Sequence, residues 1–419
     1  MFWIYGGSLQ FGNAGQAAYD GSSFAAYQDV IIVSANYRTN VFGFVGSPEL
    51  PLTGQNPGFF DQRLGLEWVQ QNIAAFGGNP SKVTIFGESA GAGSVDRLVT
   101  TLPGTKLFRA AITESGQASI NPSPSTNATV AWNTLVQMLN CTTAASQLAC
   151  VRSKPATVIQ TIIDQAALIF TPTSDGVTQL VNGQAARLAG NIAKVPLLTG
   201  TNAQEGRVFV VGDNNLTAFL ATFFAGQTQY QRLLAAAYPV GGLYPTAYDA
   251  IAQIFTEEVF QCVSHFSCIP IHLSFEEPRL IHFHQPAAIV ANATAALGIP
   301  TWRYFFNASF PNTQSYPGLG VFHSSEIPIV FGTYPTVNVT AQEYALSKFM
   351  QGAWANFAKN PTGGPGWNAL GTFPADGDLG DLGPAGSSGV TIIPQYPLDA
   401  RCGLFAPVYA ALANNTGDF

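Results

Sequence analysis

The stretch "KVTIFGESAGAGS", Lys82 to Ser94, constrains the fold more than any other part of this 419-residue chain. Its first residues are β-branched and apolar, which is typical of a strand buried on both faces. The strand runs directly into Gly87-Glu88-Ser89-Ala90-Gly91, and small residues follow. A serine on a tight turn between a strand and a helix needs glycine neighbours, because side chains on either side of its strained backbone would clash. The pattern predicts a nucleophile elbow with Ser89 as the reacting hydroxyl. The alternative is an ordinary glycine-rich helix start.

The rest of the chain alternates between strand-like and helical segments. Strands are predicted at Val30–Tyr37, Val195–Gly200 and Thr301–Asn307. Helices are predicted at Asp61–Phe76 and Tyr344–Pro361, and residues 201–260 are rich in alanine and mainly helical. This alternation favours an α/β fold: a central, mostly parallel twisted sheet with helices on both faces, in a single domain over residues 1–419.

The composition excludes several classes of partner. Hydrophobic residues make up 47% of the chain, as in a globular protein, and charged residues only 10%. With 17 basic and 24 acidic side chains the net charge is −7, and no cluster of Lys or Arg occurs, so nucleic acid is not an expected partner. No run approaches the roughly 18 apolar residues of a membrane span.

Seven Asn-x-Ser/Thr sequons indicate a glycosylated, secreted protein. They lie at Asn127, Asn140, Asn215, Asn292, Asn307, Asn338 and Asn414. The first residues, "MFWIYGG", do not have the charged start and long apolar core of a signal peptide.

The elbow and its surroundings resemble one family. "NPGFFDQRLGLEWVQQNIAAFGGNPSKV" followed by "VTIFGESAGAGSV" is similar to the type-B carboxylesterase/lipase family, which includes cholinesterases and fungal triacylglycerol lipases. The likeness continues in "YDGSSFAAYQDVIIVSANYRTNVFGF" and "LFRAAITESGQA". It implies an α/β-hydrolase fold with large insertions, and hydrolysis of a small-molecule or lipid ester through an acyl-enzyme. No cofactor and no metal are implied.

The same resemblance assigns the remaining catalytic groups. "LLTGTNAQEGRVF" resembles the acid segment of the family and gives Glu205, while "GLGVFHSSEIPIVFG" resembles its histidine loop and gives His323. The chain order of serine, acid and histidine is that of α/β-hydrolases. The oxyanion hole would consist of the N–H groups of Gly7, Ser8 and Ala90; Ser8 departs from the family, which has a third glycine there.

The beginning of the chain departs further from the family. Relatives carry additional residues ahead of the strand that corresponds to "MFWIY", so we expect the usual N-terminal portion, with its signal peptide, to be missing from this sequence. A gene model started at an internal methionine would explain both this and the secreted character.

Four of the five histidines lie in one stretch, Val263–Gln285. Their spacing with Cys262 and Cys268 fits no regular zinc pattern. Deleting the stretch joins Cys262 to Pro286, and the family has a Cys-Pro segment there. We therefore interpret residues 263–285 as a translated, unspliced intron; a genuine lid insertion is the alternative.

The five cysteines fit this interpretation. The resemblance pairs Cys141 with Cys150 and Cys262 with Cys402, which leaves Cys268 inside the suspected insertion. Two disulfides suit an oxidising compartment. Five buried thiols in a cytosolic protein are the alternative.

Two alternatives to an active esterase stay open. The family includes adhesion proteins that keep the fold and have lost the serine, and a truncated, mis-spliced gene product would do nothing. The complete set of Ser89, Glu205 and His323 argues against the first.

Overall fold

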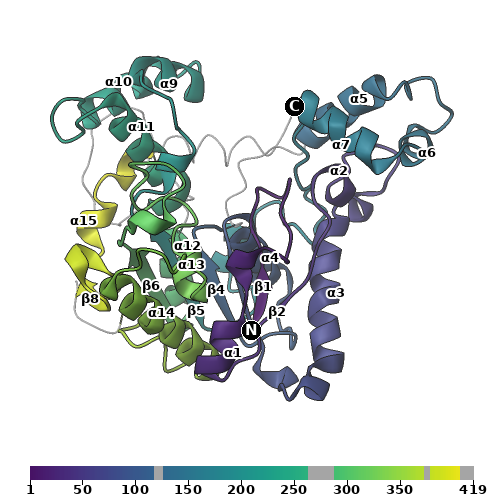
Figure 1. Ribbon diagram of the computed structural model, residues 1–419. Coiled ribbons are helices and arrows are strands. Elements are labelled where there is room, and N and C mark those ends of the chain that lie inside the picture. The colour runs from purple at the N-terminus through teal and green to yellow at the C-terminus, as the bar shows by residue number, and fades with distance from the viewer. Residues whose placement is uncertain (118–125, 263–286, 372–377, 406–419) are drawn as a thin grey trace. The chain divides into compact units, whose positions relative to one another are not determined.

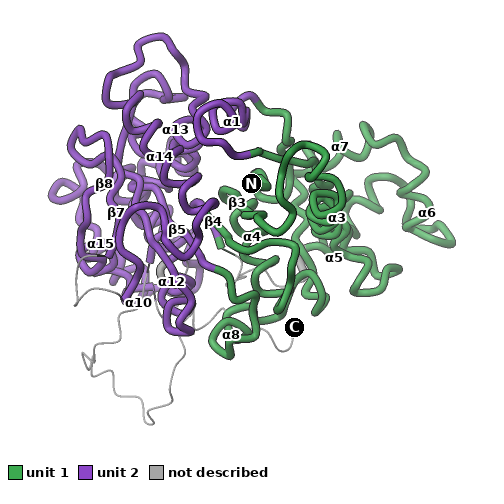
Figure 2. Tube along the Cα trace, turned by 90° about the horizontal axis from the view of Figure 1, so that it is seen from below, with its two compact units in different colours: residues 1–16, 31–113, 117–195 green, residues 17–30, 114–116, 196–419 purple. Residues whose placement is uncertain are grey.

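The computed structural model describes residues 1–117, 126–262, 287–371 and 378–405. The chain divides into two compact units, which Figure 2 colours separately. The first unit comprises residues 1–16, 31–113 and 117–195, and the second comprises residues 17–30, 114–116 and 196–419. A single domain over residues 1–419 therefore stays a prediction. The suspected insertion, Val263–Gln285, lies outside the described residues.

The first unit contains a parallel sheet that begins at the start of the chain (Figure 1). Its strands follow the order β2-β1-β3-β4, and β1 runs parallel to both β2 and β3. The strands are β1 (Phe2–Ile4), β2 (Val33–Ser34), β3 (Thr84–Glu88) and β4 (Ala110–Glu114). All five residues of β3 are buried, as its apolar sequence predicts.

The strand predicted at Val30–Tyr37 is much shorter in the structure. Only Val33 and Ser34 pair with β1, and Val30 to Val33 are half-buried rather than buried on both faces. The physical reason is that β1 itself has only three residues and offers β2 two positions for pairing.

The helices of the first unit follow β1 in the sequence. They are α2 (Asn40–Gly43), α3 (Pro57–Asn72), α4 (Ala90–Thr101), α5 (Thr126–Met138), α6 (Gln147–Arg152), α7 (Ala156–Gln165) and α8 (Gly183–Leu188). Of these, α4 packs against β1 and β3. The helix predicted at Asp61–Phe76 is α3 together with the 3-10 turn Ile73–Phe76, and proline starts it four residues earlier than expected. Of the apolar residues at helical spacing in this segment, Leu66, Val69 and Ile73 are buried, whereas Phe76 is 64% exposed because it lies at the end of the 3-10 turn after the helix.

The second unit contains the order β5-β6-β7-β8. β5 to β7 are parallel, and β8 returns antiparallel to β7. The strands are β5 (Leu197–Asn202), β6 (Thr301–Phe306), β7 (Leu379–Leu382) and β8 (Val390–Ile393). Every residue of β5 and β6 is buried, so the strands predicted around residues 195–200 and 301–307 are confirmed.

Most helices of the second unit lie between β5 and β7 in the sequence (Figure 1). These are α9 (Leu216–Phe223), α10 (Thr228–Ala237), α11 (Ala247–Thr256), α12 (Ala287–Ala296), α13 (Ile327–Phe331) and α14 (Ala341–Lys359), while α1 (Ser22–Gln28) precedes them and α15 (Tyr396–Asp399) follows β8. Capping boxes at Thr246 and Thr340 fix the starts of α11 and α14, because each threonine and the acidic residue three positions on exchange hydrogen bonds. The mostly parallel strands and intervening helices confirm the α/β class.

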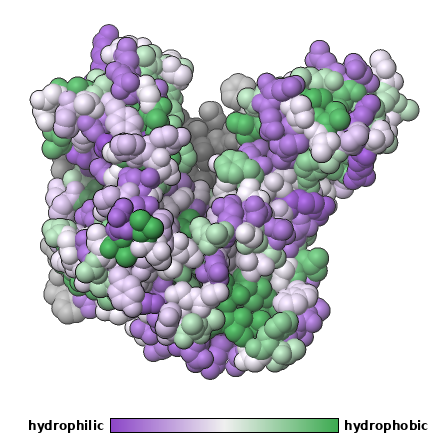
Figure 3. Space-filling model, in the orientation of Figure 1, coloured by the Kyte–Doolittle hydropathy of each residue, from purple (hydrophilic) through white to green (hydrophobic). Residues whose placement is uncertain are grey.

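The surface carries little charge but is not apolar. On the face drawn in Figure 3, hydrophilic and intermediate residues surround scattered hydrophobic ones, as expected when Ser, Thr, Asn and Gln replace charged residues. None of the helices in the described ranges is both long and apolar enough to span a bilayer.

Candidate active site

Ser89 lies on a strained turn in the first unit. It follows β3 directly and precedes the first residue of α4, with φ 56° and ψ −124°. A side chain rarely adopts this backbone conformation, and such strain persists only where the surroundings impose it. The predicted elbow between a strand and a helix is therefore present. The N–H groups of the first turn of α4 follow the serine and carry the partial positive charge of a helix start.

The glycines of the elbow are required by the close approach of β1. Ile4 lies opposite Gly87 in the parallel pairing of β1 and β3. A Cβ on Gly87 would lie 2.5 Å from the carbonyl oxygen of Ile4, and a Cβ on Gly91 would lie 2.0 Å from the same oxygen. No side chain fits at such distances. The backbone of β1 therefore dictates the pattern G-x-S-x-G.

The loop after β1 lies against this elbow. A Cβ on Gly6 would come within 2.9 Å of the Cβ of Ser89. The loop then turns sharply: Gly7 has φ 104°, and its carbonyl oxygen accepts hydrogen bonds from the N–H groups of Gln10 and Phe11. Ser8, the departure from the family, is exposed and has φ 56°, a region that favours glycine. Gly7, Ser8 and Ala90 thus belong to the same unit as Ser89.

The predicted acid and the predicted base lie in contact in the second unit. His323 Nδ1 lies 2.7 Å from Glu205 Oε2, although 118 positions separate the two residues. Glu205 is fully buried and His323 is 7% exposed. The carboxylate is an acceptor, so we assign the imidazole proton to Nδ1, and in that tautomer Nε2 is the basic nitrogen. Ser89 belongs to the first unit, and its approach to His323 is part of the function proposed below.

Main-chain and side-chain hydrogen bonds join the loop of Glu205 to the loop of His323. Gln204 and Val321 exchange two hydrogen bonds of 2.9 Å: the Gln204 N–H donates to the Val321 carbonyl, and the Val321 N–H donates to Gln204 Oε1. The N–H of His323 donates to the Glu205 carbonyl at 3.4 Å. The orientation of His323 is therefore fixed by its main chain as well as by its ring.

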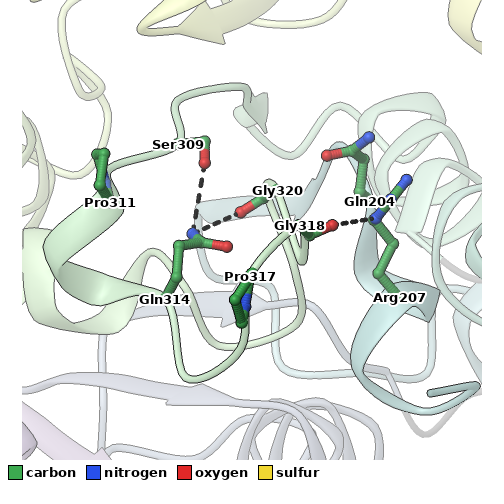
Figure 4. A pocket seen from close by; sticks show the side chains of 8 residues that line it. All are labelled: Gln204, Arg207, Ser309, Pro311, Gln314, Pro317, Gly318 and Gly320. Carbon is green, nitrogen blue, oxygen red and sulfur yellow. Dashed lines mark hydrogen bonds between the residues drawn. The ribbon is translucent and has the colours of Figure 1, made fainter. Parts of the chain in front are cut away.

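A cavity of about 590 Å³ lies beside these two loops (Figure 4). Its walls come from Gln204 and Arg207 on one side and from the segment Ser309–Gly320 on the other. Arg207 Nε donates to the Gly318 carbonyl at 3.0 Å, and Gln314 donates to the Gly320 carbonyl at 2.9 Å. Neither Glu205 nor His323 is among the residues that line the cavity.

Two phenylalanine rings pack against the imidazole of His323. The ring centroid of Phe260 lies 4.7 Å away and that of Phe209 lies 5.1 Å away. Phe260 sits in a π-helical turn, Glu257–Gln261, that continues α11, and the N–H of Cys262 donates to the Glu257 carbonyl five residues earlier. Phe209 also stacks on Phe255, at 5.2 Å. The sequence analysis missed this cluster, because a phenylalanine in an apolar helix has no feature that separates it from the core.

Both disulfides implied by the family resemblance are present. Cys141 is bonded to Cys150 in the first unit, and Cys262 is bonded to Cys402 in the second. The longer bridge is reinforced by Arg401, whose guanidinium pairs with the buried Glu257. Cys268 lies outside the described residues.

The sequons lie in different surroundings. Asn140, Asn215, Asn292 and Asn338 are exposed, and Asn307 is half-buried. Asn127 lies near the start of α5, and Asn414 lies outside the described residues. Glycosylation stays a prediction at all seven.

No group of three or more His, Cys, Asp or Glu side chains that could hold a metal ion occurs within the described parts of the chain. Four of the five histidines fall in residues 263–286, which the structure does not describe.

Comparison with known proteins identifies relatives over most of the chain. The model of the carboxylesterase family matches residues 1–374. Secreted lipase 1 of Botryotinia fuckeliana (strain B05.10) is 33% identical over 378 residues, which cover 83% of this chain and 63% of the lipase. Cholinesterase of Mus musculus is 32% identical over 398 residues, covering 87% of this chain and 62% of that protein. Acetylcholinesterase of Bungarus fasciatus is 32% identical over 390 residues, covering 86% and 61%.

This chain thus spans a little over three fifths of the length of these relatives. The family match covers far more than half of the chain and includes the elbow, the acid segment and the histidine loop. The chain belongs to the carboxylesterase family.

Proposed function

We propose that this protein hydrolyses carboxylic esters through an acyl-enzyme, with Ser89 as nucleophile, His323 as base and Glu205 as the acid that orients the base. The observation that carries the proposal is the 2.7 Å hydrogen bond between His323 Nδ1 and the fully buried Glu205 carboxylate. A buried carboxylate bonded to an imidazole is the arrangement that makes the opposite nitrogen a general base. The strained, glycine-flanked Ser89 supports the nucleophile's role.

The mechanism requires that Ser89 Oγ lie within hydrogen-bond distance of His323 Nε2. As Oγ attacks the ester carbonyl carbon, its proton passes to Nε2, and the Glu205 carboxylate stabilises the imidazolium. The imidazolium then donates this proton to the leaving alcohol oxygen as the ester C–O bond breaks. Water attacks the acyl-enzyme, His323 accepts a proton from it, and the carboxylic acid leaves as Ser89 is regenerated.

The tetrahedral intermediate carries negative charge on the former carbonyl oxygen. We assign its stabilisation to the N–H groups of Gly7, Ser8 and Ala90. Gly6, next to these donors, packs against Ser89, and Ala90 is the first residue of α4, where the helix dipole favours an anion. Fixed donors of this kind typically contribute about 10²- to 10³-fold each to the rate.

The substrate would be a small-molecule or lipid ester. The named relatives include a lipase and two cholinesterases, so acyl chain and alcohol are to be determined with a panel of esters. A secreted location accords with the two disulfides and with the name of the fungal relative.

Hydrolysis of p-nitrophenyl butyrate by the protein and by Ser89→Ala tests the proposal. The substitution should lower kcat by roughly 10⁵- to 10⁶-fold, because the triad acts as a unit. Peptide mapping after treatment with a fluorophosphonate should find the label on Ser89. Turnover that persists in Ser89→Ala, or a label on another residue, would contradict the assignment.

A further inference from the structure

Asn202, the last residue of β5, contacts Glu205 and the residue that precedes His323. Its backbone N–H donates to Glu205 Oε1 at 2.6 Å. Its side-chain Nδ2 donates to the Phe322 carbonyl at 2.9 Å and also to Glu326 Oε2. Asn202 is fully buried, as is Glu326. One residue at the end of a buried strand therefore contacts the proposed catalytic acid through its backbone, and the peptide unit next to His323 and a second carboxylate through its side chain.

We propose that Asn202 is a positioning residue for the Glu205–His323 pair. The inference deepens the proposed function and depends on it. The bond from the Asn202 N–H holds the carboxylate oxygen that does not bind His323, so it fixes the rotation of the carboxylate. The bond to the Phe322 carbonyl fixes the peptide plane that leads into His323. A small error in that plane would displace the imidazole from its productive position, and displacements of about 1 Å cost on the order of 10²-fold in rate.

The chemistry of this position requires an amide. The side-chain NH₂ group has two hydrogens, and the structure uses one for a carbonyl and one for a carboxylate, both of which are acceptors. Aspartate has the same shape but no donor when ionised. It would also bring a carboxylate against Glu326 in a buried site, where like charges repel strongly.

The hydrogen bonds of Gln204 limit how much kcat should fall when Asn202 is changed. The hydrogen bonds between Gln204 and Val321 would still hold the histidine loop at its preceding turn after Asn202 is changed. Loss of Asn202 should therefore loosen the pair without detaching it. We expect kcat for p-nitrophenyl butyrate to fall roughly 10- to 100-fold in Asn202→Asp, with KM changed less than about 2-fold.

The pH profile separates positioning from a merely structural role. The added carboxylate of Asn202→Asp favours the imidazolium, so the acidic limb of the kcat profile, measured from about pH 5 to about pH 9, should move to higher pH. The double variant Asn202→Asp with Glu326→Gln restores one bond with donor and acceptor exchanged, since the new amide can donate to the new carboxylate. It should recover part of kcat but not all of it, because the Phe322 carbonyl still lacks its donor.

Asn56→Asp is the matched control. Asn56 is also fully buried and donates to a carbonyl, that of Thr173, and to the Thr178 hydroxyl, both in the first unit. It should lose stability, measured by urea denaturation, without any shift of the pH profile. If Asn202→Asp behaves in the same way as Asn56→Asp, the inference is overturned while the proposed function stands.

An NMR titration keeps the inference testable if the wild type shows no Ser89-dependent turnover, which would contradict the proposed function itself. The resonance of His323 is assigned with His323→Gln, and its titration is compared in the wild type and in Asn202→Asp. A titration midpoint that moves to higher pH in the variant supports contact between Asn202 and the pair. An unchanged midpoint refutes it.

Discussion

The turn that holds the proposed nucleophile and the loops that hold the proposed acid and base are positioned by different kinds of contact. In the first unit, Ser89 is held by the backbone: Gly87 and Gly91 leave no room for a Cβ next to Ile4. In the second unit, Glu205 and His323 are held by side-chain hydrogen bonds between loops more than a hundred residues apart. The elbow should therefore be sensitive to added atoms, and the acid–base pair to lost donors, acceptors and charges.

Among the substitutions that test this comparison, Glu205→Gln should have the largest effect. The amide keeps the shape of the carboxylate, but it either presents its NH₂ group to Nδ1 of His323 or supports the wrong tautomer of that imidazole. The fold should be retained, while kcat for p-nitrophenyl butyrate should fall by about 10³- to 10⁴-fold. Glu343→Gln is the control, because Glu343 is also fully buried but caps α14. Its kcat should stay within about 2-fold of the wild type. Equal losses in the two variants would show that burial, and not contact with His323, matters.

Gly91→Ala should have the next largest effect, and on stability. The added Cβ would lie 2.0 Å from the Ile4 carbonyl oxygen, so β1 or α4 must move. We expect the free energy of unfolding, measured with urea, to fall by about 3 kcal/mol. In the same unit a Cβ on Gly54 meets its nearest neighbour at 3.5 Å, an ordinary contact, and Gly54→Ala should change stability by less than about 0.5 kcal/mol. Similar values for the two would contradict a backbone-determined elbow.

A rise in pH through the weakly acidic and neutral range should lower the stability of the protein through Glu258. Burial raises the pKa of Glu258 from 4.5 to about 8, so the folded protein holds a proton there that the unfolded chain releases. Stability should therefore decrease as pH rises between about 4.5 and about 8, by about 1 kcal/mol or more. In Glu258→Gln this part of the pH dependence should disappear, as chemical denaturation at several pH values can establish. The neighbouring Tyr230, whose pKa burial and Glu258 raise, should titrate only above this window.

Ser8→Gly should give the smallest effect. Ser8 adopts φ 56°, a backbone conformation that costs an L-residue about 1 to 2 kcal/mol. Glycine avoids this cost but loses more conformational entropy on folding, which offsets part of the stabilisation. A net stabilisation of about 0.5 kcal/mol is expected from thermal or urea unfolding. Ser22→Gly, in the first turn of α1, is the opposite case, since glycine in a helix destabilises. A destabilising Ser8→Gly would mean that the Ser8 side chain supports the loop.

The difference between backbone-held and side-chain-held residues also explains which parts of the site were predictable from the sequence. The elbow lies in five consecutive residues, and its glycines are needed because a larger residue would clash with the backbone of β1. The strand, the turn and the helix were therefore predictable from the local sequence pattern. The α/β-hydrolase fold implied by the resemblance is confirmed by the match to the carboxylesterase family. Glu205 and His323 required the family resemblance, because no local pattern connects residues 118 positions apart.

The supporting residues were not predictable in this way. Asn202 and Gln204 act through hydrogen bonds to loops near residue 322, and their identity as Asn and Gln is equally suited to a solvated turn. The packing of the Phe260 ring on His323 depends on a π-helical turn, which the local sequence pattern does not predict. The shortened strand β2 likewise reflects the length of its neighbour β1 rather than its own apolar sequence.

The π-helical turn Glu257–Gln261 determines the rotational phase of Phe260 about the helix axis. Phe255 and Phe260 are five residues apart, yet their rings lie 6.3 Å from each other and both stack on Phe209. In an α-helix, five residues advance by about 500°, which would leave the two rings about 140° out of phase. The wider turn absorbs most of this difference. The extra residue of the turn therefore keeps Phe255 and Phe260 on one side of the helix. Deleting one residue between them would leave the two rings four positions apart and about 40° out of phase in an ordinary α-helix, so the Phe260 ring would still face the imidazole.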